Sequence, residues 1–218
     1  MLGRAKIILG VFAVGLFLVP ISIASADTPY ILATIAPQTI GLTGSTWAKS
    51  DVTVAILAEK EVTQAVIDTV KQAVDDWNRA IQAKLSPQLS PFHLVLPTSN
   101  TPDITFRVRK TWDQTWSTCS ARDGFLVSCE LNIVLDQVAS NKLQSISLAR
   151  LGFALGVWDS DHPKDVMYTY TNWTNGPTNI TLSQCDLAAW KVVMDWLLKG
   201  SPKPYTPSVT YLTCSRTS

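Results

Sequence analysis

The sequence predicts a single α/β (α+β) domain, and three observations lead to this fold class. Strand-like runs rich in β-branched and aromatic residues occur at 51–57, 103–108 and 125–135. Helical patterns with apolar residues every three or four positions separate or follow these runs, which gives the order β-α-β-β-β-α-α. The chain of 218 residues is long enough for one domain with a sizeable core, and it contains no internal repeat.

The strand at 51–57 leads into the clearest element, a long helix that ends before Pro87. Its apolar residues recur at steps of three or four, so they form one stripe that faces a core. The stripe consists of Val62, Val66, Val70, Val74, Trp77, Ile81 and Leu85.

The next elements are predicted strands at 92–96 and 103–108, separated by turn residues. The run at 125–135 is interpreted as the return arm of a hairpin that turns at 121–124, where Asp-Gly favours a turn over a calcium loop.

Two further helices complete the pattern. The second covers about 143–155 and stops at Gly156, a natural C-terminal residue for a helix. The third begins at Ser183 with Asp186 three residues on, which resembles a capping box. The segment 157–181 between them shows little regular pattern.

The domain is therefore expected at 47–200, with an extended lead-in at 27–46 and a C-terminal tail at 201–218. Lys and Arg number 18 and Asp and Glu 17, so the chain has almost no net charge. This balance argues against a nucleic-acid partner, because such proteins rely on a basic field.

The N-terminus reads as a secretory signal peptide at 1–26. Arg4 and Lys6 precede an uncharged run at 7–26 that ends in Ala-Ser-Ala, which predicts cleavage before Asp27 and a secreted or extracytoplasmic protein. The alternative is a retained membrane anchor, because the uncharged run nearly spans a bilayer.

Four cysteines beyond the signal agree with an oxidising compartment, where an even number indicates disulfides. Three pairings are possible. We favour Cys119 with Cys129, across the hairpin, and Cys185 with Cys214, between the last helix and the tail.

The segments 148–159 (LARLGFALGVWD) and 165–168 (DVMY) resemble the matrixin-type metzincin zinc peptidases. The signature of that family is H-E-x-x-H-x-x-G-x-x-H followed by a Met-turn. Gly156 matches the glycine of the signature, and Met167 matches the Met-turn. The resemblance covers about 47–199. It implies a mostly parallel twisted sheet with a long first helix, an active-site-type helix, a Met-turn and a C-terminal helix.

The residues that carry the family's chemistry are replaced. Ala149, Phe153 and Asp159 stand at the three histidine positions, and Arg150 stands at the general-base glutamate. Arginine is always protonated and cannot accept a proton, and one carboxylate does not supply the three ligands that catalytic zinc needs. We therefore expect no catalytic residue and no zinc, with Ala149 and Phe153 filling the vacated site as core.

Other residues offer weak substitutes. His162 lies near Asp159 and Asp161, so a cation there is conceivable, although a solvated acidic turn is the favoured interpretation. His93 is interpreted as a partly exposed strand residue. Among the tryptophans, we expect Trp77, Trp190 and Trp196 in the core, with Trp158 and Trp173 beside the vacant site.

Three functional hypotheses follow. The leading one is a secreted pseudo-peptidase that binds a peptide or protein without cutting it. The second is a structural envelope component anchored in the membrane by residues 7–26. The third is an active metallopeptidase with a site rebuilt around Asp159 and His162.

Overall fold

A six-stranded, mostly parallel sheet forms the centre of this computed structural model, which describes residues 38–84, 92–96, 101–112, 117–168 and 181–214. The strands run in the order β2-β7-β5-β3-β4, all parallel, and β6 adds to β7 in antiparallel orientation. Their bounds are β2 Thr46–Trp47, β3 Val52–Ala58, β4 Phe92–Leu94, β5 Ile104–Arg109, β6 Thr118–Arg122 and β7 Phe125–Val134. The predicted α/β fold with a mostly parallel sheet is confirmed.

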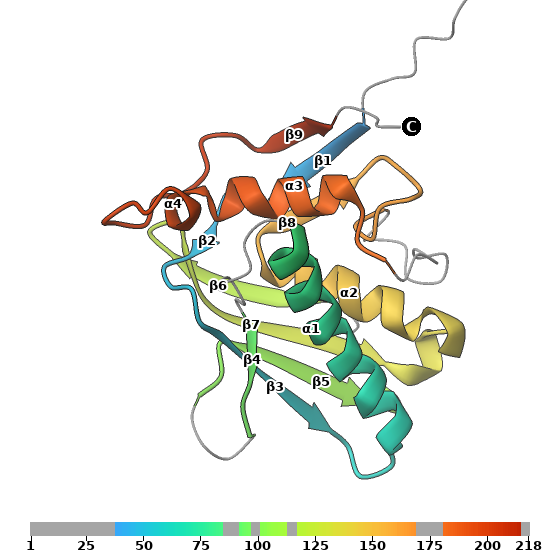
Figure 1. The fold of residues 1–218 in the computed structure, drawn as a ribbon. Coiled ribbons are helices and arrows are strands. Elements are labelled where there is room, and N and C mark those ends of the chain that lie inside the picture. The colour runs from blue at the N-terminus through green and yellow to red at the C-terminus, as the bar shows by residue number, and fades with distance from the viewer. Residues whose placement is uncertain (1–37, 85–91, 97–100, 113–116, 169–180, 215–218) are drawn as a thin grey trace, which may run out of the picture. The chain divides into compact units, whose positions relative to one another are not determined.

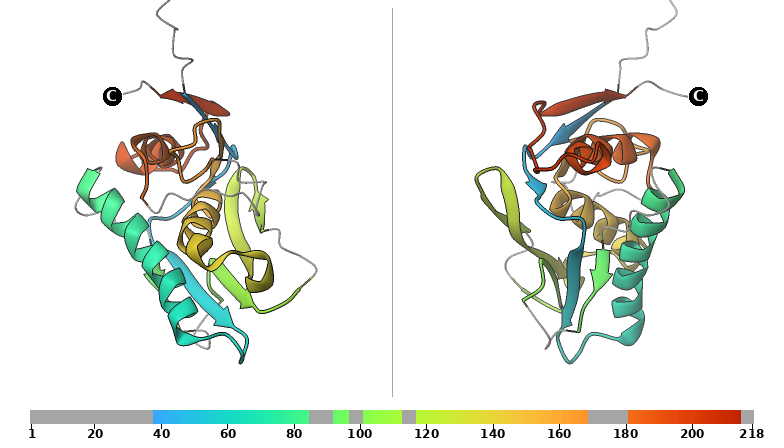
Figure 2. Two further views of the ribbon diagram at one scale, coloured as in Figure 1. Left: turned by 90° about the vertical axis from the view of Figure 1, so that its right-hand side faces the viewer. Right: turned by 60° about the vertical axis from the view of Figure 1, so that its left-hand side comes forward.

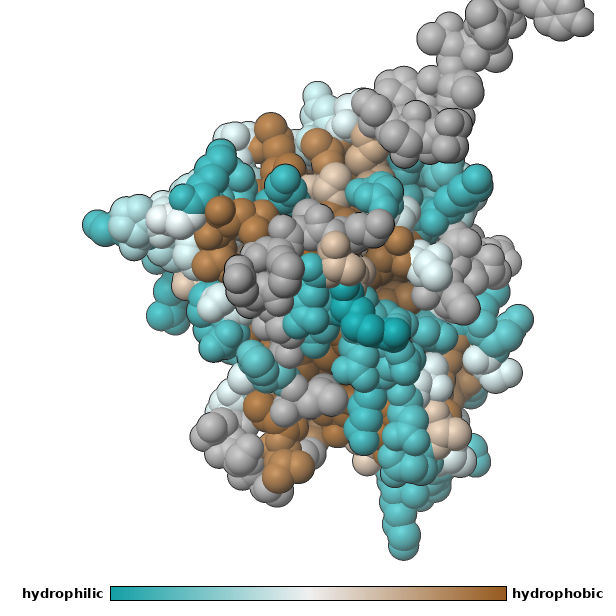
Figure 3. Space-filling model, in the orientation of Figure 1, coloured by the Kyte–Doolittle hydropathy of each residue, from teal (hydrophilic) through white to brown (hydrophobic). Residues whose placement is uncertain are grey.

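The helices α1 (Gln64–Lys84) and α2 (Leu143–Ala154) pack against each other on one face of this sheet (Figures 1 and 2). Indole nitrogens fix α2 at two points. Trp77 Nε1 donates to Leu148 O at 3.0 Å, and Trp47 Nε1 donates to Ala154 O at 2.8 Å. The opposite side of α1 faces solvent and is hydrophilic (Figure 3).

The sheet is buried mainly on the helical face, as β5 shows. Ile104, Phe106 and Val108 are fully buried, whereas the residues between them are half-buried. On the half-buried face Arg107 Nε lies 2.7 Å from Glu130 Oε2 of the adjacent strand β7. This alternation fits a sheet with one covered face.

A second, three-stranded sheet has the order β8-β1-β9 and is entirely antiparallel. Its strands are β1 (Gln38–Leu42), β8 (Val157–Ser160) and β9 (Tyr211–Cys214). These strands lie in segments expected as a lead-in, an irregular stretch and a tail. Contacts accordingly define one compact unit at Ala36–Ser218, wider than the expected 47–200, because both ends of the segment pair with each other.

The third predicted helix divides into α3 (Gln184–Val193) and α4 (Asp195–Leu198), with a break at Met194. The expected capping box is present: the Ser183 hydroxyl accepts from Asp186 N at 3.0 Å, and the Asp186 carboxylate accepts from Ser183 N at 2.8 Å. Short 3₁₀ turns at Leu135–Gln137 and Ser140–Lys142 connect β7 to α2.

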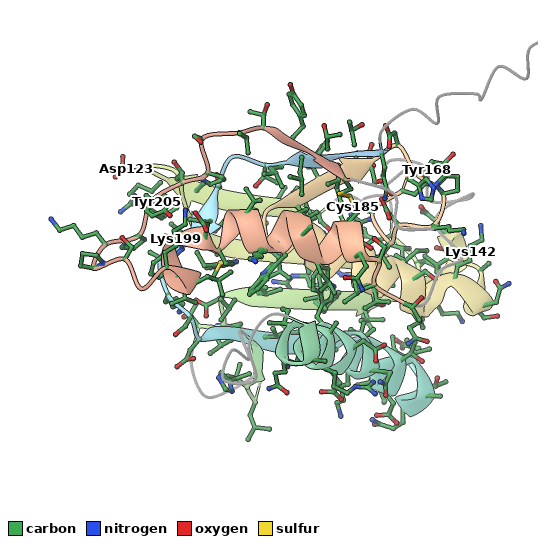
Figure 4. The ribbon with its side chains drawn as sticks, turned by 45° about the horizontal axis from the view of Figure 1, so that its top comes forward. Asp123, Lys142, Tyr168, Cys185, Lys199 and Tyr205 are labelled. Carbon is green, nitrogen blue, oxygen red and sulfur yellow. A yellow bond between two sulfur atoms is a disulfide. The ribbon has the colours of Figure 1, made fainter. Side chains whose placement is uncertain are left out.

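Both expected disulfides are present. Cys119–Cys129 joins directly opposed residues of β6 and β7, and Cys185–Cys214 joins α3 to β9. The β6–β7 hairpin turns at Asp123 and Gly124, which both have positive φ (53° and 81°), as an Asp-Gly hairpin turn requires. Figure 4 labels Asp123, in the turn of this hairpin, and Cys185, on α3.

The expected signal peptide or anchor at 1–26 lies outside the described residues, and so does Trp173. No helix in the part of the chain that the structure describes is both long and apolar enough to cross a bilayer.

Candidate functional site

The helix α2 presents the replaced metal-ligand positions, and its side chains face different surroundings. Ala149 is buried, with 1% of its surface exposed, whereas Phe153 one turn later is only half-buried. The expectation that Phe153 fills the vacated site as core is therefore wrong in part. Gly156 ends the helix with φ 89°, as predicted, and a Cβ there would lie 2.6 Å from Ser45 O.

Arg150, at the general-base position, is buried, with 1% of its surface exposed. Together with residues of β7, the following 3₁₀ turn and α2, it lines a cavity of only about 10 Å³, no larger than one water molecule. Phe153 lines a separate, larger cavity. Arg150 is therefore not among the residues that line the cavity that Phe153 faces.

The larger cavity, which we name the β6–α2 groove, has a volume of about 420 Å³. Three segments line it: the end of β1 with the stretch that follows, the β6–β7 hairpin, and the end of α2 with β8. The lining residues are Leu42, Thr43, Ser45, Cys119, Ala121, Leu126, Phe153 and Trp158. None of these described residues carries a charge. A volume of this size falls within the range of ligand pockets.

Two aromatic rings form one wall of the β6–α2 groove. The Phe153 and Trp158 ring centroids are 5.3 Å apart with an interplanar angle of 58°, a favourable tilted arrangement. Trp158 is 40% exposed. The expectation that Trp158 flanks the vacant site therefore agrees with the structure, and Trp77, Trp190 and Trp196 are buried as predicted.

The opposite wall is formed by the β6–β7 hairpin, whose strand β6 is the outer strand of the sheet. In the described part of the chain, β6 pairs only with β7, so its outer edge has no strand partner. Cys119 and Ala121, two residues apart on β6, both line the groove. The strand opposite them bulges at Val127, which has no partner in the register and is 53% exposed.

Met167 lies in a tight turn beneath α2. Tyr168 N donates to Asp165 O at 3.2 Å, which closes the turn, and Met167 is fully buried. A Cβ on Gly152 would collide with the Met167 sulfur, so the glycine allows the turn to approach the helix. The assignment of this turn as a Met-turn stays a prediction from the sequence.

Asp186 at the start of α3 fixes this turn. Its carboxylate accepts from Val166 N at 3.0 Å and from Met167 N at 3.4 Å, in addition to the capping bond from Ser183. Burial and the nearby charge of Asp165 raise the pKa of Asp186 to about 6. Asp186 was not among the predicted site residues, although the capping-box pattern had marked it as structural.

Asp165, a second buried carboxyl next to this turn, connects the turn to the small sheet. Its Oδ2 accepts hydrogen bonds from Gln38 Nε2 and Ser160 Oγ, whereas its buried Oδ1 has no hydrogen-bond partner among the described residues. Both donors lie on strands of the small sheet, β1 and β8. These bonds place the turn between the small sheet and α3.

The alternative cation site is not assembled. Asp161 accepts hydrogen bonds from the backbone N and the hydroxyl of Thr39. Partial desolvation raises the pKa of Asp161, but these bonds lower it by more, so the pKa lies below its ordinary value. His162 Nδ1 accepts from Lys164 N at 3.3 Å. Among the described residues, no group of three or more His, Cys, Asp or Glu side chains is placed to hold a metal ion.

Zinc therefore does not fit the residues present. Ala149 and Phe153 offer a methyl group and a ring, and the remaining ligand position, Asp159, supplies one carboxylate where three ligands are needed. His93 lies on β4, on the edge of the sheet opposite β6, with Nε2 3.5 Å from Asp51 Oδ1.

Sequence reasoning missed the part of the groove formed by Leu42, Thr43 and Ser45, because these residues lie in the expected lead-in. The only signal for them was the β-branched and apolar character of the segment around Ile40.

No family model matches the sequence, and no curated protein is similar to it at a significant level. Among solved structures, the chain is similar to a crystal structure of archaemetzincin from Methanopyrus kandleri. The two share 7% sequence identity with a TM-score of 0.40, and the match covers 65% of this chain and 94% of that chain. This likeness concerns the fold and assigns no role to any residue of the site. The resemblance to matrixins in particular stays a prediction.

Proposed function

We propose that this chain is a secreted, matrixin-like protein of the metallopeptidase fold that cuts no peptide bond and binds an extended peptide or protein segment in the β6–α2 groove. The observation that carries the proposal is the open edge of β6 beside an uncharged cavity. An extended segment binds such an edge by adding a strand, which uses only backbone groups and survives the loss of a metal.

The residues at the ligand and base positions of the signature support the absence of catalysis. A zinc peptidase needs three ligands and a base that accepts a proton from the attacking water. The corresponding residues are Ala149, Phe153, Asp159 and Arg150, and the arginine lies buried in a separate cavity. These residues therefore supply neither a set of three zinc ligands nor a base.

The two disulfides support secretion, because such bonds persist in oxidising compartments. They are compatible with an extracytoplasmic protein. Cleavage before Asp27 is part of the proposal and is checked by N-terminal sequencing of the exported chain.

The test has two arms on the purified exported chain. Panning of a displayed random peptide library should select peptides, and N-methylation of alternate backbone nitrogens in a selected peptide should abolish binding, because it blocks strand pairing. Elemental analysis after chelator-free purification should find no stoichiometric zinc. Unchanged affinity of every N-methylated peptide contradicts strand addition, and one zinc per chain contradicts the non-catalytic assignment.

A matched pair of variants locates the site. Ala121→Trp fills the β6–α2 groove and should weaken binding of the selected peptide. Leu96→Ala changes an exposed apolar side chain that follows β4, on the opposite edge of the sheet, and should leave binding unchanged. The reverse result would place the peptide on β4.

A further inference from the structure

The lining of the β6–α2 groove limits the side chains that it accepts. Its polar residues Thr43 and Ser45 are hydrogen-bonded to each other, with Ser45 N donating to Thr43 Oγ1 at 3.3 Å. The other lining residues are apolar or belong to a disulfide. A charged side chain would lose hydration in this cavity and find no opposite charge among the lining residues.

The aromatic wall of the groove is held in place before any ligand binds. A Cβ on Gly41 would lie 3.1 Å from Trp158 Cβ and 3.2 Å from Trp158 Cδ1, so the indole packs over the bare backbone of Gly41. Phe153 packs against the hydrophobic core and contacts the same indole. Two fixed rings lose little conformational freedom when a third ring stacks on them.

The geometry of β6 brings one side chain of an added strand toward this wall. Alternate residues of a strand point to the same face, and Cys119 and Ala121 are the alternate residues of β6 that line the groove. Both are small, which leaves room next to them. A peptide strand paired to β6 therefore directs one of its alternate side chains into the cavity.

We infer that the groove selects a peptide with an aromatic side chain at this position, seated against Phe153 and Trp158. The inference rests on the proposed function and deepens it, because it names the class of ligand. Aromatic pairs gain affinity beyond their buried area, so an aromatic residue should bind roughly two- to tenfold more tightly than leucine at the same position.

The experiment uses acetylated and amidated peptides of the sequence Thr-Val-Thr-X-Thr-Val-Thr, in which X is Phe, Leu, Lys or Glu, and measures Kd for the exported chain. The peptide with Phe should bind most tightly and those with Lys and Glu most weakly. Equal affinity for Phe and Leu overturns the inference and leaves the proposed function standing. No binding of any peptide overturns both.

Two variants connect the preference to the aromatic wall. Phe153→Leu should weaken binding of the Phe peptide and bring the ratio of the Kd values for Leu and Phe close to one, and Trp158→Leu should do the same. Leu96→Ala is the control on the opposite sheet edge, and the ratio there should equal that of the unmodified chain. A ratio that survives both groove substitutions, or that falls in Leu96→Ala, overturns the inference.

Discussion

The turn beneath α2 and the β6–α2 groove differ in how their side chains are held. In the turn, Met167 is fully buried and the backbone nitrogens of Val166 and Met167 donate to the buried Asp186. In the groove, Phe153 is half-buried and Trp158 is 40% exposed, and none of the described lining residues carries a charge. The turn therefore depends on its particular residues for stability, whereas the groove leaves its surface open to a ligand.

The largest effect on stability is expected from Asp186→Ala. The substitution leaves the buried N–H groups of Val166 and Met167 and the part-buried N–H group of Ser183 without their acceptor. We expect a loss of about 3–5 kcal/mol in the free energy of unfolding, measured by urea denaturation. Asp195→Ala, which removes a partly exposed carboxylate from α4, is the control and should cost far less. Equal losses would show that the turn is not held by Asp186.

The pH dependence of stability should follow from the same carboxyl. The pKa of Asp186 is raised from 3.8 to about 6 by burial and by Asp165, so the folded chain binds this proton more tightly than the unfolded chain. The resulting stability is present below about pH 4 and is lost as the pH rises through about 6, by an amount on the order of 3 kcal/mol.

Denaturation at a series of pH values, compared between the unmodified chain and Asp186→Asn, isolates this contribution. The unfolding free energy of the unmodified chain should fall relative to that of Asp186→Asn as the pH rises from about 4 to about 7. If the difference between the two free energies stays constant with pH, or if the unmodified chain becomes relatively more stable as the pH rises, the burial of a titrating Asp186 is contradicted.

The close approach of the turn to α2 predicts a smaller effect. Gly152→Ala places a methyl group against the Met167 sulfur, and Trp77 Cζ2 lies 3.3 Å from the same point. We expect a net loss of about 1–2 kcal/mol despite the higher helix propensity of alanine. In a Met167→Ala background, the added methyl should cost nothing. Additive effects of the two substitutions would show that the residues do not touch.

The smallest effect on stability should come from the groove. Phe153→Ala removes a half-buried ring at the edge of the core, and we expect a loss of about 1 kcal/mol, well below the cost of a fully buried phenylalanine. Thermal denaturation of this variant beside Asp186→Ala gives the comparison directly. A loss as large as that of Asp186→Ala would mean that the groove residues serve the core.

Most strands of the large sheet and the long helices could be predicted from the sequence because their periods are local, whereas the two-residue strand β2 was not predicted. The apolar stripe from Val62 to Ile81 and the alternation in β5 each indicate a buried face from the sequence of one segment alone. The cap at Ser183 and the stop at Gly156 are also local signals, and both are present.

The small sheet and the groove could not be predicted in the same way. β1 pairs with β8 and β9, which are more than 100 residues away along the chain, and the strands are only four or five residues long. The position of Phe153 depended on this sheet, because Leu42 and Trp158 form the cavity that it faces. The burial of Arg150 next to β7 could not be predicted either, because it depends on residues that are distant in the sequence.

The most direct test of the proposed function is amide hydrogen exchange of the exported chain with and without a library-selected peptide. Strand addition in the β6–α2 groove predicts slower exchange within Thr118–Arg122 of β6, and unchanged exchange within Phe92–Leu94 of β4, the opposite edge of the sheet. Slower exchange on β4 with no change on β6 would contradict the account, because the peptide would then bind away from Phe153 and the replaced metal positions.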